Sequence, residues 1–378
     1  MKKKQIVEKV DQSILKPLLQ KSLHCDSIEN IVWNHTQITP TVYHFTGTGN
    51  SEGEEVPWSI FLKVLSPMID FDPPSDLSWK HESLIYQSNL KEHLPEGLGV
   101  PRCFEVVYKS ESEIWIWLED VTEVSDLPWT LNRYQLAAQH LGRLNGEWIE
   151  KIKTTSRPWL NKSNRLRKVV KRGASGIELL CQSLNHPNVS RFYSKVMVND
   201  IFRFWAERQT FLQVLDDLPQ TFCHLDASRR NIFSRRKANV NSEDTVLIDW
   251  GYAGIGAIGE EVASLGNGAL LSFEFEKKEA QKVNEVIFEG YLEGLSDAGW
   301  NKDGHLVRYG YTSASALRYI TRGPEMIVPL LLSESKDQKV QLQQTFGRPL
   351  PEILEHWLAL THYWLRLARE AQGLLKKI

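Results

Sequence analysis

The chain has 378 residues, of which 42% are apolar and 24% charged, a composition typical of a globular protein with two domains or one large bilobal unit. This excludes a small disulfide scaffold and a disordered or collagen-like chain. Lysine and arginine number 45 against 47 acidic residues, so no field of the whole protein would draw it to nucleic acid or to an anionic membrane.

The N-terminus and the cysteines indicate a compartment. Three lysines at the start are followed by Glu8 and Asp11, which interrupt the sequence before the apolar core of a signal peptide could form. The longest uncharged apolar stretch, residues 262–273, is too short to span a bilayer. The four cysteines show no metal-ligand spacing, which favours reduced thiols. We therefore expect a soluble cytoplasmic protein with neither a membrane nor a nucleic acid as partner.

The first third of the chain predicts a five-stranded antiparallel sheet with one helix. Short runs of β-branched and aromatic residues are separated by turn residues, including a polar turn at Gly47–Gly53. After the third strand, Pro73–Asp76 and apolar residues at helical spacing predict the helix. The predicted strands are Ile28–Trp33, Thr41–Thr46, Trp58–Leu65, Pro101–Lys109 and Glu113–Val121.

Beyond Val121 the apolar residues recur at intervals of three and four, which predicts a mainly helical remainder. The exception lies between Pro219 and Tyr252, where short strands surround a polar segment. The whole therefore reads as an α+β protein. The helices are expected at Tyr134–Ile149, Asp200–Leu215, Glu274–Leu295 and Pro351–Leu375, and the short strands at Thr221–Asp226, Asn231–Phe233 and Thr245–Trp250.

The segment around these short strands has the spacing of a phosphoryl-transfer site. His224 and Asp226 precede Asn231, and Asp249 ends a hydrophobic strand. Asp226 suits the task of orienting an acceptor hydroxyl and taking its proton. Asn231 and Asp249 suit Mg²⁺, which prefers a few hard oxygen ligands together with phosphate and water. We expect His224 to hydrogen-bond the loop rather than to do chemistry.

At these residues the sequence resembles the aminoglycoside phosphotransferase and choline kinase family of protein-kinase-like small-molecule kinases. Lys63 resembles the third-strand lysine that binds the α- and β-phosphates, and Glu82 resembles the helix glutamate that pairs with it. Glu119 and Val121 lie in a segment that resembles the hinge, where adenine meets backbone groups. Glu261 stands where relatives commonly carry Asp.

The resemblance implies a bilobal protein-kinase-like fold, with a nucleotide-binding lobe over residues 1–121 and a helical lobe over residues 122–378. It implies an enzyme that moves a phosphate from ATP or GTP, with Mg²⁺, to a hydroxyl of a small molecule such as an aminoglycoside, sugar or amino alcohol. The sequence leaves the acceptor and the oligomeric state open. Residues 251–299 hold nine acidic and three basic side chains, which is compatible with a cationic acceptor and equally with ordinary exposed helix charge. The basic pair Arg229 and Arg230 is equally compatible with an anionic or neutral sugar.

This sequence departs from the pattern of its relatives at several positions. Leu225 stands where many relatives have Gly, and Trp250 stands where protein kinases have Phe. Two other functions remain as alternatives, a pseudokinase-like binding module and a protein kinase. Intact Lys63, Asp226, Asn231 and Asp249 argue against the first, and the lack of an activation segment argues against the second.

Two further patterns have simpler interpretations. Gly254–Gly259 matches the glycine spacing of a dinucleotide-binding turn, but glycine does not follow the strand directly, so we expect a flexible loop there. Six of the eleven residues from Lys162 to Arg172 are basic. Because no nucleic-acid recognition motif accompanies them, a solvated helix face is expected.

Overall fold

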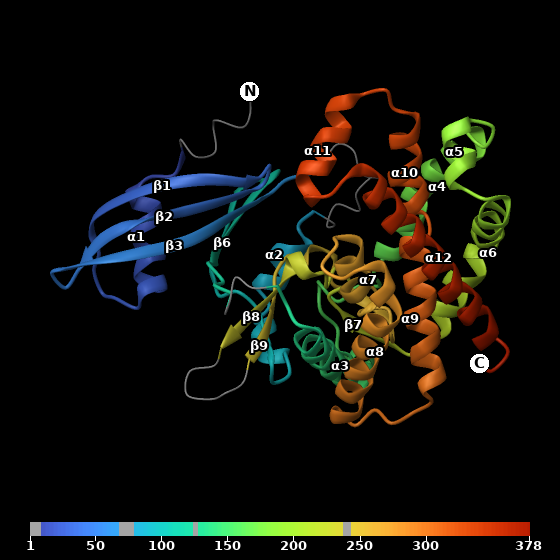
Figure 1. Cartoon of the computed structure of the whole chain (residues 1–378). Coiled ribbons are helices and arrows are strands. Elements are labelled where there is room, and N and C mark those ends of the chain that lie inside the picture. Colours follow the sequence, from blue (N-terminus) through green and yellow to red (C-terminus); the bar gives the residue numbers. More distant parts are fainter. Residues whose placement is uncertain (1–8, 68–78, 124–127, 237–242) are drawn as a thin grey trace. The chain divides into compact units, whose positions relative to one another are not determined.

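The computed structural model describes residues 9–67, 79–123, 128–236 and 243–378 (Figure 1). The predicted helix start at Pro73–Asp76 lies outside them. The chain divides into two compact units, which are described separately below. Unit 1 comprises residues 1–94, 99–125 and 233–251, and unit 2 comprises residues 95–98, 126–232 and 252–378.

The main sheet of unit 1 is antiparallel, with the strand order β1-β2-β3-β6-β5 (Figure 1). This confirms the predicted five-stranded sheet. The predicted turn at Gly47–Gly53 is wrong in its extent, because residues 47–51 continue the second strand and the chain reverses only at Glu52 and Gly53. The strands are β1 (Glu29–Thr39), β2 (Val42–Ser51), β3 (Glu54–Leu65), β5 (Cys103–Ser110) and β6 (Glu113–Glu119).

The strand β6, which lies between β3 and β5, is buried on both faces. Trp115 and Trp117 belong to a core that also contains Leu15, Leu18 and Leu19 of the helix α1 (Gln12–Leu23). The opposite face, with Ile114, Ile116 and Leu118, packs against Trp79 and Tyr86 at the short helix α2 (His81–Tyr86). The sequence did not predict α1, although a sheet with large apolar side chains on both faces needs a cover on each.

A small second sheet carries the predicted catalytic strands. It has the order β4-β9-β8, with β4 at Leu98–Gly99, β8 at Ile232–Arg236 and β9 at Glu243–Leu247. The strand β9 ends two residues before Asp249.

Unit 2 is mainly helical, as predicted, and contains one two-stranded sheet of β7 and β10 among its described residues. The predicted glycine-rich loop at Gly254–Gly259 is a strand over its first four residues. The elements are α3 (Leu131–Thr154), α4 (Arg165–Gln182), α5 (Pro187–Phe192), α6 (Lys195–Asp217), β7 (Gln220–Cys223), β10 (Gly254–Ala257), α7 (Ala263–Leu271), α8 (Ala280–Asp297), α9 (Gly304–Tyr319), α10 (Arg322–Leu332), α11 (Lys336–Phe346) and α12 (Leu350–Leu374).

The close crossing of α3 and α8 fixes the position of β7. Glycines allow the crossing, since a Cβ atom on Gly294 would lie 1.9 Å from the carbonyl oxygen of Gln139. The buried side chain of Asn145 on α3 then joins three elements. Its amide donates to the carbonyl of Phe222 on β7 at 2.8 Å, and its oxygen accepts from the hydroxyl of Tyr291 on α8 at 2.6 Å. The strand that leads into the predicted catalytic loop is therefore anchored to two helices.

None of the described helices combines the length and the apolar composition needed to cross a membrane.

Candidate active site

Lys63, Glu82 and Asp249 meet in unit 1, as the sequence predicted for the first two. Lys63 lies on the face of β3 that also carries Phe61 and Leu65, and this face packs against the region of α2. Its ammonium nitrogen is 2.5 Å from Oε2 of Glu82 and 2.8 Å from Oδ1 of Asp249. Burial by itself would lower the pKa of Lys63, but the charges of Glu82 and Asp249 outweigh it and raise that pKa. Lys63 is thus a fixed positive charge with two carboxylate partners.

Asp249 adopts an uncommon backbone conformation. Its φ of 62° lies in the left-handed region, which Asp and Asn enter more readily than most residues with a Cβ atom. The side chain is 42% exposed, whereas Glu82 is buried beneath it. The turn after β9 therefore presents the Asp249 carboxylate at the surface of unit 1, beside the Lys63 ammonium.

Asp226 and Asn231 meet in unit 2, in the loop that follows β7. The side-chain nitrogen of Asn231 donates to the Asp226 carbonyl oxygen at 2.9 Å and to Asp226 Oδ2 at 3.0 Å. Because the nitrogen makes both bonds, the oxygen of the Asn231 amide is directed away from Asp226. His224 is buried, and its Nδ1 accepts from the backbone N–H of Asp226 at 3.3 Å, which agrees with the expected loop-supporting role.

Glu261 fixes the backbone of this loop by hydrogen bonds. Its buried carboxylate accepts from the backbone N–H groups of His224 at 2.5 Å and of Leu225 at 3.0 Å. Burial raises the pKa of Glu261 to about 7, against the opposing effect of these two N–H donors. From the other direction, the buried guanidinium of Arg318 donates to the Leu225 carbonyl at 2.8 Å. The loop is therefore fixed at both backbone polar groups of Leu225.

Leu225 itself has a φ of 62°, in the region that favours glycine. This explains why a glycine suits the position in relatives. The side chain is buried here, and the space it fills borders Gly256, whose Cβ atom would lie 3.1 Å from Leu225 Cδ2. The chain thus combines a strained backbone with a well-packed leucine.

Two arginines contact Asp226. Nη2 of Arg165 lies 3.0 Å from Oδ1, and both side chains are nearly buried. Nη2 of Arg230 lies 3.6 Å from Oδ2, and the Arg230 side chain is 75% exposed. Oδ1 is therefore held by Arg165, whereas Oδ2 accepts from Asn231 at 3.0 Å and lies nearer to the exposed Arg230.

Glu119 and Val121, predicted to contact the nucleotide, lie at and just after the end of β6. Within the described residues the Glu119 carboxylate accepts from the backbone N–H of Arg102 at 2.8 Å and pairs with Arg235 at 3.1 Å. Val121 is half-buried. These contacts tie Glu119 to neighbouring strands, and a role of either residue in binding adenine stays a prediction.

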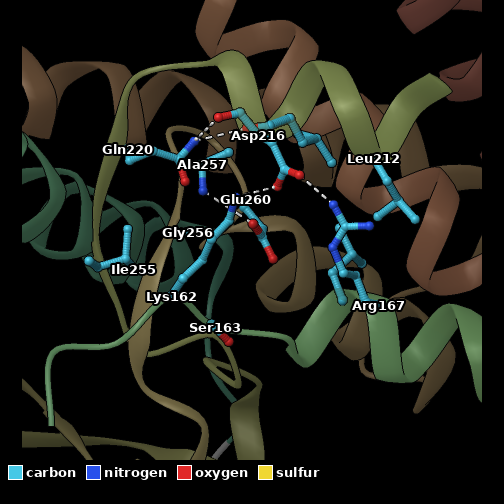
Figure 2. Close-up of a pocket in the computed structure, with 12 residues that line it drawn as sticks. Lys162, Ser163, Arg167, Leu212, Asp216, Gln220, Ile255, Gly256, Ala257 and Glu260 are labelled. Carbon is cyan, nitrogen blue, oxygen red and sulfur yellow. Dashed lines mark hydrogen bonds and ion pairs between the residues drawn. The ribbon is translucent and has the colours of Figure 1, made fainter. Parts of the chain in front are cut away.

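A small cavity in unit 2 lies between the start of α4, the end of α6 and β10 (Figure 2). Its volume is about 30 Å³, room for a water molecule or two rather than for a substrate. Glu260 lines it, and the Glu260 carboxylate accepts from the N–H of Ala257 at 3.2 Å. Burial raises the pKa of Glu260. We assign this cavity to packing.

The sequence did not single out Arg165 or Arg318 as loop contacts. Arg165 belongs to a basic run for which a solvated helix face was expected. No motif or pattern around Arg318 in the sequence indicates a contact with the loop. Both reach the loop through tertiary packing of α4 and α9. Glu261 was noted only as a family position, and its pairing with two backbone N–H groups becomes visible in the structure.

The chain is similar to known proteins over part of its sequence and in its fold. A family model described as the phosphotransferase enzyme family matches residues 178–302. A choline kinase from Cryptosporidium parvum Iowa II is similar in structure, with a TM-score of 0.52 and 12% identity over 97% of this chain and 93% of that chain. An amicoumacin kinase in complex with AMP-PNP and Ca²⁺ has a TM-score of 0.51 and 12% identity over 93% of this chain and 96% of that chain. No curated protein matches the chain in sequence.

The two solved structures share the fold of this chain and confirm the predicted protein-kinase-like α+β class. The family match spans the loop with Asp226 and Asn231 and the turn with Asp249. Together they support the resemblance drawn from the motifs: residues 178–302 are similar to the phosphotransferase enzyme family, and the chain has the fold of the two kinase structures.

Proposed function

We propose that this enzyme moves the γ-phosphate of ATP or GTP to a hydroxyl of a small molecule, with Asp226 as general base. The observation that carries the proposal is the pairing of Lys63 with both Glu82 and Asp249 in unit 1. Burying a lysine with two carboxylates costs desolvation free energy, so such a cluster is weak evidence for stability and points to a function of the charge. The anion that a phosphotransferase must hold is a nucleotide polyphosphate. Unit 1 is then the nucleotide-binding part, with adenine at the backbone of Glu119 to Val121.

Asn231 and Asp249 fit a magnesium ion by the chemistry of their donor atoms. The Asn231 amide nitrogen is used within the loop, which leaves its oxygen to face a cation, and the Asp249 carboxylate is partly exposed. Such an ion would neutralise charge on the transferred phosphate. The remaining work belongs to the protein, since Lys63 holds phosphate oxygens and Asp226 orients the acceptor.

Asp226 supplies the proton acceptor. Its Oδ1 is held by Arg165, and Oδ2, which accepts from the Asn231 amide at 3.0 Å, keeps a second lone pair for an incoming hydroxyl. The hydroxyl proton passes to Oδ2 as the hydroxyl oxygen bonds to phosphorus and the bond from phosphorus to the nucleotide oxygen breaks. We expect the acceptor to be a small molecule of the kind that the similar kinases use, namely an aminoglycoside or other antibiotic, a sugar or an amino alcohol.

A screen of such acceptors tests the function. Purified full-length protein with ATP or GTP and Mg²⁺ is offered a library of antibiotics, sugars and amino alcohols, and nucleoside diphosphate release is measured. Asp226→Asn should bind nucleotide as the wild type does but lose roughly 10²-fold or more in turnover, the scale of a positioned general base. Nucleotide binding without turnover on any acceptor would instead favour the binding module, and wild-type turnover by Asp226→Asn would remove Asp226 from its role.

A further inference from the structure

One residue of the basic run Lys162 to Arg172 differs from the rest. The side chain of Arg165, at the first position of α4, is 11% exposed. Its neighbour Arg167 is 44% exposed and pairs with Asp216, which also binds Lys162 at 2.9 Å (Figure 2). The expected solvated face is therefore wrong for Arg165, which turns toward the catalytic loop.

The guanidinium of Arg165 is held between a carboxylate and an aromatic ring. Nη2 lies 3.0 Å from Asp226 Oδ1, and the guanidinium carbon lies 3.7 Å from the ring centre of Tyr252. Charge-assisted hydrogen bonds and cation–π contacts are both stronger where water is scarce. The ring fixes the plane of the guanidinium, and the guanidinium fixes the Asp226 carboxylate.

The backbone before Arg165 is tied to the sheet that leads into the loop. The N–H of Ser163 donates to the carbonyl of Ile255 at 2.9 Å, and the N–H of Ile255 donates to the carbonyl of Asn161 at 2.8 Å. The hydroxyl of Ser163 then accepts from the N–H of Arg165 at 3.1 Å. This close approach requires glycine at position 254, because a Cβ atom there would lie 2.7 Å from the Asn161 carbonyl oxygen.

The same sheet carries the loop itself. β10 pairs with β7 in antiparallel register, with Gly254 opposite Cys223, and Cys223 immediately precedes the loop. The start of α4 and the loop are therefore positioned by one small sheet. The backbone, the ring of Tyr252 and the ion pair together fix the orientation of the Arg165 guanidinium. A side chain that contributed only positive charge would not need a fixed orientation.

We propose that Arg165 is a positioning residue for phosphoryl transfer, which holds Asp226 Oδ1 so that Oδ2 faces the acceptor hydroxyl. This proposal rests on the proposed role of Asp226 as general base. Arg230, the other arginine at Asp226, is largely exposed and lies 3.6 Å from Oδ2, so it constrains the carboxylate less than Arg165 does. Arg165 adds no chemical step of its own and acts through Asp226.

The test compares Arg165→Ala and Arg165→Lys with the wild type, using ATP and Mg²⁺ with an acceptor from the screen and, in parallel, with water as acceptor. We expect kcat to fall roughly 10- to 100-fold in both variants, the scale of a misplaced reacting group, while KM for the nucleotide stays unchanged. Lysine should not replace arginine, because it lacks the planar fork and the stacking. Added methylguanidine should restore part of kcat to Arg165→Ala but not to Arg165→Lys.

Two controls separate positioning from general stability. Arg167→Ala, on the same helix but paired with Asp216, should keep the wild-type kcat. In the Asp226→Asn background, Arg165→Ala should cause no further loss, because residues that act as one unit are not additive. If Arg165→Ala does not fold, Tyr252→Leu carries the test with Tyr252→Phe as its matched control, and only the leucine variant should lose kcat.

The outcomes for the two proposals are distinct. Wild-type turnover in Asp226→Asn would overturn the proposed function itself. Loss of turnover in Asp226→Asn with an unchanged kcat in the Arg165 variants, or in Tyr252→Leu, would overturn only the role of Arg165. An equal loss in Arg165→Ala and Arg167→Ala, without rescue by methylguanidine, would show that α4 acts through stability alone.

Discussion

The ammonium of Lys63 on β3 and the buried carboxylate of Glu82 on α2 lie 2.5 Å apart. Removing one partner of a buried pair leaves an uncompensated charge, which typically costs about 3–5 kcal/mol, whereas removing both costs less. Lys63→Met should therefore destabilise unit 1 more than the double variant Lys63→Met with Glu82→Gln. Denaturant unfolding of the single and double variants checks this order.

The same pair makes a second prediction, about nucleotide binding. Lys63→Met should weaken nucleotide affinity severely, and Glu82→Gln less, because Asp249 still holds the ammonium at 2.8 Å. The double variant should bind little worse than Lys63→Met alone, since the effect of Glu82 passes through Lys63. Calorimetric titration with a non-hydrolysable nucleotide measures all three, and two losses that add in full would mean that the side chains act independently.

At Asp249 the effect of the carboxylate charge can be tested separately from the effect of the backbone conformation. Asn tolerates the left-handed φ of 62° and keeps the shape of the side chain, so Asp249→Asn removes charge without adding strain. We expect this variant to bind nucleotide equally with and without Mg²⁺, whereas the wild type should bind more tightly with the ion. Calorimetry in the presence and absence of Mg²⁺ makes the comparison, and a variant that keeps the full response to the ion would assign Asp249 a structural role.

The sequence predicted the parts of this protein that depend on local pattern. The strands of the main sheet, the helices α3, α6, α8 and α12, and the pairing of Lys63 with Glu82 follow from residues that alternate, recur or match a motif. The sequence did not predict α1. The apolar residues of this helix pack against the sheet core that contains Trp115 and Trp117, a tertiary contact that no local pattern indicates. The sequence also missed the place of Arg165, because the position of α4 is set by hydrogen bonds between Asn161, Ser163 and β10 that have no periodic signature.

Leu225 shows how a departure from the family pattern is compensated. Relief of its left-handed backbone would gain about 1–2 kcal/mol, whereas loss of a buried leucine side chain costs about 2–5 kcal/mol, so Leu225→Gly should be destabilising overall. Leu225→Ala loses almost the same side chain but keeps the strain. The glycine variant should therefore be the more stable of the two, against the usual order. Unfolding free energies compare them, and alanine above glycine would show that the φ of Leu225 carries no strain.

Glu261 gives the loop a dependence on pH whose sign can be worked out. Burial raises the pKa of Glu261 from 4.5 to about 7 in the folded protein, so the folded state binds a proton that the unfolded state releases between these values. The stabilisation from this group is complete below about pH 4.5 and is lost as the pH rises to about 7.

The free energy of unfolding of the wild type should thus fall, relative to that of Glu261→Gln, as the pH rises through this window. Chemical denaturation of both proteins at several pH values measures the difference, in which the other titrating groups cancel. A difference that is flat between pH 4.5 and 7, or that rises, would show that the two N–H donors of His224 and Leu225 outweigh burial and keep the carboxylate ionised throughout.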